Sequence, residues 1–194
     1  NEDRWQIGHD LWENDNEVFR PGQSMTQLIT EETLTFLDEN HQRPFFLFVP
    51  FSAPHWPIQP AREYLERNKH LASPRREYAA MVSQLDDAVG EIVHRVNELQ
   101  IRNRTLILFL SDNGPSVEQP ANFGGGSAGQ FRGHKKSIFE GGIREPLIAN
   151  WPGKIPQGIS QEVPVIVMDL FPTLTRLAGA ELPNIDGVDI WPLM

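Results

Sequence analysis

The chain has 194 residues, of which 39% are hydrophobic and 22% are charged. This composition is typical of a globular domain with one sizeable core. The longest apolar run, residues 45–51, contains Pro50 and is far shorter than the roughly 18 residues that a membrane-spanning helix needs. The absence of cysteine excludes disulfides, thiolate metal sites and a cysteine nucleophile.

The net charge of −9 is unevenly distributed. Residues 1–50 carry −7, whereas residues 101–150 carry +2. An acidic chain is a poor general binder of nucleic acid or anionic lipid, so neither is an expected partner. The basic block can still hold a single anion.

The first fifty residues contain one predicted helix and one predicted strand. Residues 1–20 are polar, with Trp5 and Trp12 as isolated anchors, and the pattern predicts no element there. Ser24 is a good N-cap, which predicts a helix up to about residue 40. The run at residues 45–49 predicts a buried strand. The apolar face of the helix is expected to consist of Met25, Leu28, Ile29, Phe36 and Leu37.

The rest of the chain alternates helices and strands. Apolar residues three and four apart predict an amphipathic helix over residues 75–100. Strands are predicted at 105–110 and 146–151, with a flexible glycine-rich connection at 124–127 between them. Asp169 is expected to cap a last helix. This order predicts an α/β fold with a mostly parallel sheet sandwiched by helices.

Polar residues follow the first predicted strand, where the ligands of open α/β sheets collect. His55 lies between Pro54 and Pro57, whose fixed φ angles stiffen the loop. A positioned imidazole can act as a general acid, donate a hydrogen bond to an anion or bind a metal. A capping or solvent-facing histidine is the alternative interpretation.

Asp112 and Asn113 follow the second long predicted strand. A carboxylate and an amide carbonyl are oxygen ligands that suit a hard cation such as Ca²⁺ or Mg²⁺. The same Asp-Asn-Gly sequence also forms tight turns, so both interpretations remain open on this evidence.

A basic cluster follows at residues 132–144, where Arg132, Lys135, Lys136 and Arg144 outnumber the single acid Glu140. Such a cluster can bind phosphate, sulfate or carboxylate, with arginine making paired hydrogen bonds and lysine acting as a point charge. A solvated run of charges is the alternative. The preceding glycines do not match a phosphate-binding loop, because no Gly-Lys-Ser/Thr follows them.

Together these motifs resemble the type I, formylglycine-dependent sulfatases of the alkaline phosphatase superfamily, in particular arylsulfatases and N-acetylgalactosamine-6-sulfatases. The resemblance covers residues 44–194 and follows the family's order. It is carried by Pro54-His55-Trp56-Pro57, Ser111-Asp112-Asn113-Gly114-Pro115 and Gly133-His134-Lys135, and by residues 46–49, 85–90, 139–146, 151–153, 169–174 and 186–189.

The resemblance implies roles for individual residues. Asp112 and Asn113 would bind Ca²⁺, with Mg²⁺ a less suitable ion. Lys135 would bind the sulfate and the bridging oxygen, and His55 would bind sulfate or protonate the leaving alcohol. A sugar subsite lined by further side chains is also expected: Trp56, Arg132 and His134.

Three other residues match family positions without a catalytic role. Glu140 and Arg144 are expected only to order their loop. Asp87 is interpreted as a residue of the helix surface, because it lies within the amphipathic helix at 75–100.

The family's nucleophile motif, Cys/Ser-x-Pro-x-Arg, is missing from the chain. Residues 52–56 begin correctly but place Trp56 where arginine is required. The family's N-terminal Asp-Asp metal pair is missing too. We therefore expect residues 1–194 to be part of a catalytic domain, without its nucleophile-bearing N-terminal half and its C-terminal subdomain, and to be inactive alone.

The resemblance implies a sulfuric ester hydrolase that acts on a sulfated small molecule or glycan in the periplasm, in the lysosome or outside the cell. The oligomeric state is not predicted. Two alternatives remain open: a phosphodiesterase or phosphonate hydrolase of the same superfamily, and a non-catalytic protein that binds sulfated glycans.

Overall fold

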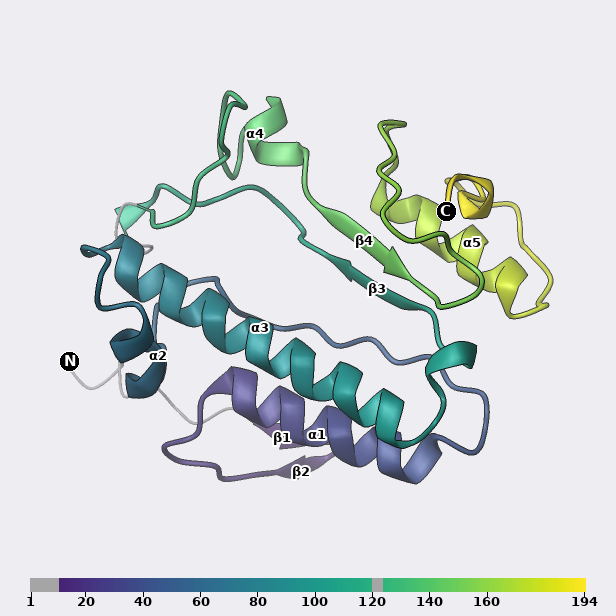
Figure 1. The fold of residues 1–194 in the computed structure, drawn as a ribbon, viewed down its shortest axis with the longest axis horizontal. Coiled ribbons are helices and arrows are strands. Elements are labelled where there is room, and N and C mark those ends of the chain that lie inside the picture. The colour runs from purple at the N-terminus through teal and green to yellow at the C-terminus, as the bar shows by residue number, and fades with distance from the viewer. Residues whose placement is uncertain (1–10, 120–123) are drawn as a thin grey trace. The chain divides into compact units, whose positions relative to one another are not determined.

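The computed structural model describes residues 11–119 and 124–194, so Trp5 lies outside the described residues. The chain divides into two compact units (Figure 1). The first contains the described residues up to Arg95 together with Asn113–Arg144, and the second contains Val96–Asp112 and Glu145–Met194. One boundary between the units therefore falls between Asp112 and Asn113.

The first unit is mostly helical. Near its start, a small antiparallel hairpin forms in a segment where the sequence pattern predicts no element. No helix in the described ranges is both long and apolar enough to span a lipid bilayer. The elements of the first unit are β1 (Trp12–Glu13), β2 (Asn16–Glu17), α1 (Met25–Asn40), α2 (Arg62–Arg67), most of α3 (Arg75–Glu98) and α4 (Glu140–Ile143).

Helix α1 begins as predicted but buries a different face. The Ser24 hydroxyl accepts a hydrogen bond from the Gln27 backbone N–H at 3.2 Å, which satisfies a donor of the first turn. The predicted apolar face is only partly buried: Leu37 is buried, Leu28, Ile29 and Phe36 are half-buried, and Met25 is 42% exposed. A threonine can be buried where its hydroxyl bonds to the preceding turn, as Thr30 does to the Thr26 carbonyl at 2.7 Å. The buried residues are Thr26, Thr30, Thr33, Leu37 and Asn40.

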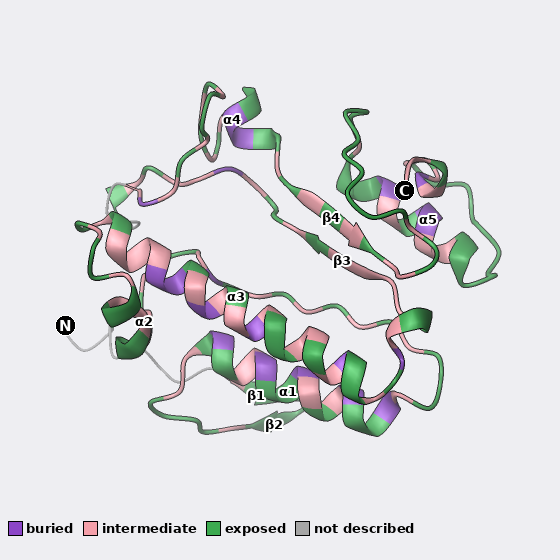
Figure 2. Ribbon diagram, viewed as in Figure 1, coloured by how far each residue is buried: buried purple, intermediate pink, exposed green. Residues whose placement is uncertain are grey.

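Helix α3 confirms the predicted amphipathic helix and lies beside α1, running in the same direction (Figure 1). The Gln84 amide donates to the Ser24 hydroxyl at 2.7 Å, and Arg95 forms an ion pair with Asp38 at 3.1 Å. These contacts, near the two ends of α1, fix the register of the helices. Figure 2 shows the buried positions of both helices in purple, among them a stripe at four-residue spacing on α3: Ala80, Gln84 and Ala88.

The segment at residues 45–49 is extended but pairs with no described strand, so the strand prediction is wrong for this structure. Phe45 packs edge to face against Phe36 of α1, with ring centroids 5.7 Å apart. Phe46 and Phe48 are each 74% exposed. The side chains alternate as in a strand, but a ladder requires a neighbouring backbone, and none of the described strands provides one.

The second unit is built on an antiparallel strand pair in which Leu110 lies opposite Leu147. Both strand pairs in the described part of the chain are antiparallel, so the predicted parallel pairing is not made by these strands. A parallel pair needs a crossover that returns the chain to the same end, and the long connection from β3 to β4 does not do so. The elements are η2 (Arg102–Arg104), β3 (Ile107–Leu110), β4 (Leu147–Asn150), η4 (Val167–Asp169), α5 (Leu170–Leu177) and η5 (Trp191–Leu193).

Asp169 does not cap α5 as predicted, because that helix has no side-chain cap. Its buried carboxylate instead accepts hydrogen bonds from the backbone N–H groups of Ile166 and Val188, each at 2.9 Å. Asp169 therefore joins the start of α5 to a segment about twenty residues later. A local capping rule cannot reveal such a distant partner.

Candidate active site

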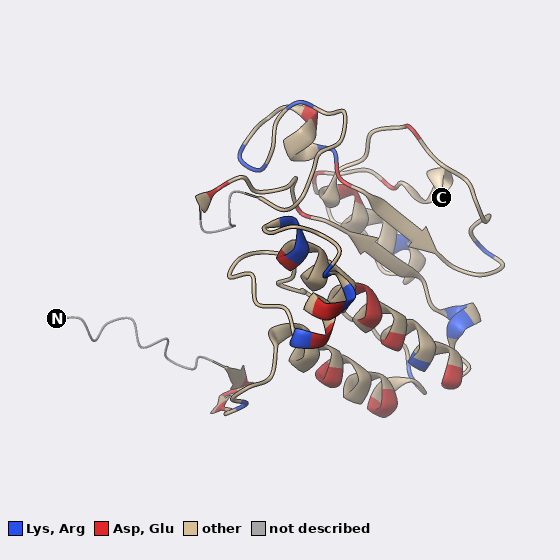
Figure 3. Cartoon of the chain, turned by 60° about the vertical axis from the view of Figure 1, so that its left-hand side comes forward, with Lys and Arg blue, Asp and Glu red and all other residues tan. Residues whose placement is uncertain are grey.

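The segment that carries the predicted anion-binding lysine is fixed to the loop after Asp112 by backbone hydrogen bonds. The Gly114 N–H donates to the Gly142 carbonyl at 3.1 Å, and the Lys135 N–H donates to the Pro115 carbonyl at 3.0 Å. A third bond, from the Gly141 N–H to the Arg132 carbonyl at 2.7 Å, closes the segment on itself. We name residues 132–144 the lysine segment. Its charged residues occupy positions on and beside α4, coloured blue and red in Figure 3.

The contact between these loops is close enough to require glycine. A Cβ atom added to Gly114 would lie 2.0 Å from the Gly141 carbonyl oxygen. A Cβ on Gly141 would lie 2.4 Å from the Gly133 oxygen, and one on Gly142 would lie 2.3 Å from the Ser137 oxygen. All of these neighbours are backbone atoms, which cannot rotate away. The glycines therefore serve close backbone approach.

The charges around Lys135 are partly paired. The Lys136 ammonium forms an ion pair with Glu118 and thereby lowers the pKa of that carboxyl; Lys135 adds a smaller effect of the same sign. Lys136 adopts a φ of 73°, a left-handed conformation that L-residues other than glycine rarely take. In the described part of the chain the Lys135 ammonium has no ion-pair partner of its own.

Arginine–aromatic contacts stiffen the lysine segment. The Arg132 guanidinium lies 3.9 Å from the centroid of the Phe139 ring, and that of Arg144 lies 4.7 Å from the Phe131 ring. Arg144 also pairs with Glu140 at 3.3 Å. These contacts give Glu140 and Arg144 a structural role in ordering the loop.

The His55 loop, residues 52–57, is held by local contacts. The His55 N–H donates to the Ser52 carbonyl at 2.8 Å, and ring atom Nδ1 lies 2.6 Å from the Trp56 carbonyl. Because a carbonyl only accepts, Nδ1 carries the proton in this contact. Nε2 is then the ring atom left for a ligand: it accepts when the imidazole is neutral and donates when it is protonated. The exposed His55 side chain lies beside the Trp56 ring, with ring centroids 5.3 Å apart.

His134 repeats this arrangement on the lysine segment. Its Nδ1 lies 2.8 Å from the Lys135 carbonyl and therefore carries the proton, as in His55, which leaves Nε2 to contact a ligand. The side chain is exposed, as are those of Trp56 and Arg132, which form the rest of the predicted sugar subsite.

Asp112 and Asn113 carry the predicted cation ligands. The Asn113 amide nitrogen donates to the Gly114 carbonyl at 3.0 Å, and its Oδ1 is an amide oxygen of the kind that binds hard cations. The Asp112 carboxylate is exposed just beyond β3. Continuing the β3–β4 register places it opposite Glu145, whose pKa is raised by burial and by the negative charge of Asp112.

These observations fit part of a cation site. The side chains of Asp112, Asn113 and Glu145 offer oxygen ligands, and a bound cation would reduce the repulsion between the Asp112 and Glu145 carboxylates. Ca²⁺ takes about six to eight oxygen ligands, whereas residues 11–119 and 124–194 contain no group of three acidic or histidine side chains that could hold a metal. The sequence prediction did not include Glu145, because its position opposite Asp112 follows from the pairing of β3 with β4, which a local pattern does not contain.

The glycine-rich connection, which the sequence predicts to be flexible, is closely packed in the structure. A Cβ on Gly125 would lie 2.2 Å from the Tyr78 Cβ, and one on Gly126 would lie 2.8 Å from the Pro115 Cβ. A run of glycines is compatible with flexibility and with tight packing alike, and only the neighbouring side chains distinguish the two.

Asp87 confirms its assignment to the surface of α3. It forms an ion pair with Arg67 of α2, and this partner lowers the pKa of the Asp87 carboxyl. Asp87 therefore ties α2 to α3 and makes no contribution to a metal group in the described residues.

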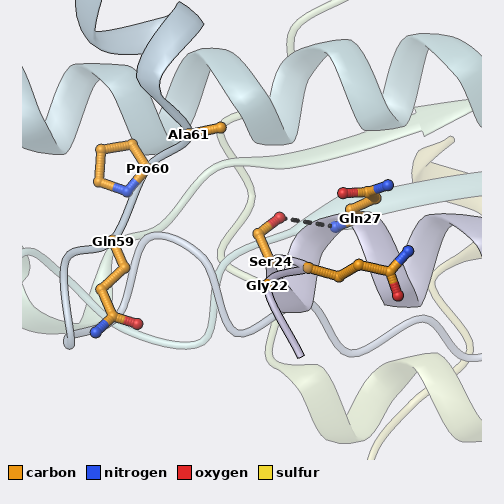
Figure 4. A pocket seen from close by; sticks show the side chains of 7 residues that line it. Gly22, Ser24, Gln27, Gln59, Pro60 and Ala61 are labelled. Carbon is orange, nitrogen blue, oxygen red and sulfur yellow. Dashed lines mark hydrogen bonds between the residues drawn. The ribbon is translucent and has the colours of Figure 1, made fainter. Parts of the chain in front are cut away.

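A pocket of about 320 Å³ lies away from every predicted site residue. It opens at the beginning of α1, where Ser24 caps the helix (Figure 4). Its lining is uncharged, and its one hydroxyl, that of Ser24, is bonded to the Gln27 N–H and to the Gln84 amide. The lining residues are Gly22, Gln23, Ser24, Gln27, Gln59, Pro60 and Ala61.

The structure thus joins some predicted site residues and leaves others separate. Hydrogen bonds connect the Asn113 loop with the lysine segment. Among the described residues, no hydrogen bond connects either of them with the His55 loop. Asp112 belongs to the second unit and the remaining candidates to the first.

Comparison with known proteins gives one consistent result. A family model described as Sulfatase matches residues 3–180. N-acetylgalactosamine-6-sulfatase of Mus musculus is 40% identical over 176 residues, which cover 88% of this chain and 33% of that protein. Steryl-sulfatase of Rattus norvegicus is also 40% identical over 176 residues, covering 88% and 30%. The chain spans about a third of the length of these relatives.

Solved structures support the same fold. Ps i-CgsB, in complex with k-i-k-neocarrahexaose, has a TM-score of 0.85 and 34% identity, covering 92% of this chain and 40% of that one. The PsFucS1 sulfatase from Pseudoalteromonas sp. has a TM-score of 0.76 and 33% identity, covering 87% and 34%. These similarities confirm the predicted α/β fold class.

Proposed function

Because the chain belongs to the sulfatase family, we propose that the whole protein of which it forms part hydrolyses sulfate esters. The observation that carries this proposal is the fixed connection between the lysine segment and the Asn113 loop. It holds an ammonium without an ion-pair partner on a rigid backbone beside a loop of oxygen donors. Positive charge fixed in advance around an anion is commonly the largest contribution to such catalysis.

Lys135 and His55 then perform different tasks. The Lys135 ammonium binds the sulfate oxygens and offsets charge that develops on the bridging oxygen. His55 holds Nδ1–H on the Trp56 carbonyl, which orients Nε2 toward the leaving oxygen. In the protonated ring, Nε2 donates a proton to the departing alcohol.

Asp112 and Asn113 are proposed to hold a Ca²⁺ ion, with Mg²⁺ a poorer fit because Mg²⁺ demands a near-ideal octahedral set of ligands. When bound, the cation supplies positive charge to the sulfate oxygens. The Asn113 amide nitrogen, held by the Gly114 carbonyl, keeps the side-chain carbonyl in a fixed orientation. Asp112, Asn113 and Glu145 do not complete the coordination of Ca²⁺, so further oxygen ligands are proposed to come from other parts of the protein.

The nucleophile must also come from outside this chain. The 194 residues contain no cysteine and no Ser-x-Pro-x-Arg sequence. The family's formylglycine, formed in a preceding part of the protein, is the proposed nucleophile, so residues 1–194 alone should be inactive.

A sulfated carbohydrate is the proposed substrate class. The similar Ps i-CgsB was solved with an oligosaccharide, and the exposed side chains beside the site suit a sugar. Trp56 offers an aromatic face, and Arg132 and His134 offer donors to neighbouring sulfates. A compartment outside the cytoplasm, such as the periplasm, the lysosome or the extracellular space, is proposed from the family alone.

The deciding experiment compares an aryl sulfate with the corresponding phosphate mono- and diesters, using the full-length protein. We expect turnover of the sulfate, and a fall of about three orders of magnitude in kcat/KM for Lys135→Ala. Lys154→Ala, which removes the same charge from the second unit, is the control. Preferred hydrolysis of the phosphate esters, or full activity of Lys135→Ala, would contradict the proposal.

A further inference from the structure

The first turn of helix α3 holds the glycine loop, which we define as Gly124–Gly126. The Arg75 guanidinium donates a hydrogen bond to the Gly125 carbonyl and lies 5.8 Å from the Tyr78 ring centroid. The Tyr78 side chain lies directly against the loop: a Cβ on Gly125 would be 2.2 Å from its Cβ, and one on Gly126 would be 3.0 Å from its hydroxyl. A charged donor and an aromatic ring thus fix a backbone that glycine alone would leave free.

The glycine loop in turn packs on the residues that hold Lys135. A Cβ on Gly124 would lie 2.7 Å from the Ser116 carbonyl oxygen, and one on Gly126 would lie 2.8 Å from the Pro115 Cβ. The carbonyl of the same Pro115 accepts the hydrogen bond from the Lys135 N–H at 3.0 Å. A continuous series of contacts within the first unit therefore leads from α3 to the backbone of Lys135.

We infer that Arg75 and Tyr78 are positioning residues for Lys135, acting through the glycine loop and Pro115. The inference rests on the proposed function, in which the Lys135 ammonium must meet the sulfate oxygens. Displacements of about 1 Å can reduce catalysis strongly, and Lys135 lies in a loop with no strand or long helix of its own. Helix α3, one of the two long helices of the first unit, supplies the rigid reference.

Hydrogen exchange of the full-length protein tests the mechanical part without any assay of activity. In Arg75→Gln, peptides covering residues 132–142 should exchange about tenfold faster than in the wild type, because the loop loses its charged donor. Arg95→Gln, which removes the same charge from the other end of α3 and its ion pair with Asp38, should leave those peptides unchanged. Equal exchange in the wild type and Arg75→Gln would overturn the inference.

A double-mutant cycle tests the consequence for anion binding. Arg75→Gln should raise the inhibition constant of inorganic sulfate about tenfold, and Arg75→Lys should restore most of the loss. In a Lys135→Ala background Arg75→Gln should change nothing further, because both substitutions act on the same ammonium. An equal effect with and without Lys135 would show a merely structural role and contradict the inference.

Tyr78→Phe provides a milder variant if Arg75→Gln folds poorly. It keeps the ring against Gly125 and removes only the hydroxyl beside Gly126, so the same changes should appear at a smaller size. The proposed coupling would be excluded if Tyr78→Phe and the wild type exchanged hydrogen at the same rate and the effects in the double-mutant cycle were fully additive.

The proposed function would be overturned if the wild type neither hydrolysed sulfate esters nor bound sulfate. In that case the hydrogen-exchange comparison would still decide whether Arg75 and Tyr78 position Lys135.

Discussion

The lysine segment and the His55 loop both present an exposed histidine whose Nδ1 contacts the next carbonyl, but different forces hold them. The lysine segment is fixed by backbone bonds to residues about twenty to thirty positions away, such as Lys135 to Pro115 and Gly114 to Gly142. Among the described residues, the hydrogen bonds of the His55 loop reach partners no more than three residues away. The difference shows that the position of the Lys135 ammonium depends on tertiary contacts, whereas a short turn is enough to orient the His55 imidazole.

The largest effect on the lysine segment is expected from Gly114→Ala. Its Cβ would meet the Gly141 carbonyl oxygen at 2.0 Å, so one of the two loops must move. We expect a loss of about 3 kcal/mol in the free energy of unfolding, measured by urea denaturation of the full-length protein. Gly129→Ala is the matched control, because its Cβ would meet nothing within 4 Å, although its φ of 61° adds a small strain. Equal losses of unfolding free energy in Gly114→Ala and Gly129→Ala would show that the close contact between the two loops does not stabilise the lysine segment.

The His55 loop should respond in the opposite way. His55→Ala removes the acid but no long-range contact, so sulfate-ester turnover should fall about a hundredfold while the free energy of unfolding changes by less than about 0.5 kcal/mol. Steady-state kinetics and urea denaturation measure the two quantities. A large loss of stability would show that this loop is also held by tertiary contacts.

A smaller effect separates backbone strain from charge in the lysine segment. Lys136 has a φ of 73°, which glycine adopts without strain and alanine does not. Lys136→Gly and Lys136→Ala both remove the ion pair with Glu118, yet the glycine variant should be more stable by about 1 kcal/mol. Thermal or urea unfolding of the two variants side by side gives the difference. If Lys136→Ala were more stable than Lys136→Gly, backbone strain at position 136 would be excluded.

The smallest effect concerns the ion pair between Glu118 and Lys136. Its ammonium partner lowers the pKa of the Glu118 carboxyl in the folded state, so the stabilisation is complete above the unfolded pKa of about 4.3 and is lost as the pH falls through the lower folded value. The difference in Tm between the wild type and Glu118→Gln should be greatest at pH 7 and should shrink as the pH falls below about 4. A difference independent of pH would exclude the ion pair as its cause.

Several elements follow from the sequence because their causes are local. The Ser24 cap, the three- and four-residue spacing along α3, and the apolar runs of β3 and β4 predict those elements with nearly correct bounds. The motifs around His55, Asp112 and Lys135 likewise indicate the family, since each is a short segment with a fixed order.

Other features depend on partners that a local pattern does not contain. The face that α1 buries most completely carries three threonines, Leu37 and Asn40, which the apolar pattern of the helix does not indicate. The run at residues 45–49 has the alternation of a strand and lacks a described neighbour to pair with. Asp169, predicted as a cap, bonds across nineteen positions to Val188.

By itself, the sequence determined the family, the chemical types at the site and the long helices. Only the tertiary structure decided that the glycine loop is closely packed, that β3 and β4 are antiparallel, and that Lys135 is joined to the Asn113 loop. The physical reason is the reach of the interactions involved. Capping and periodicity act within about one or two turns, whereas close backbone approach and strand pairing depend on residues brought together by the fold.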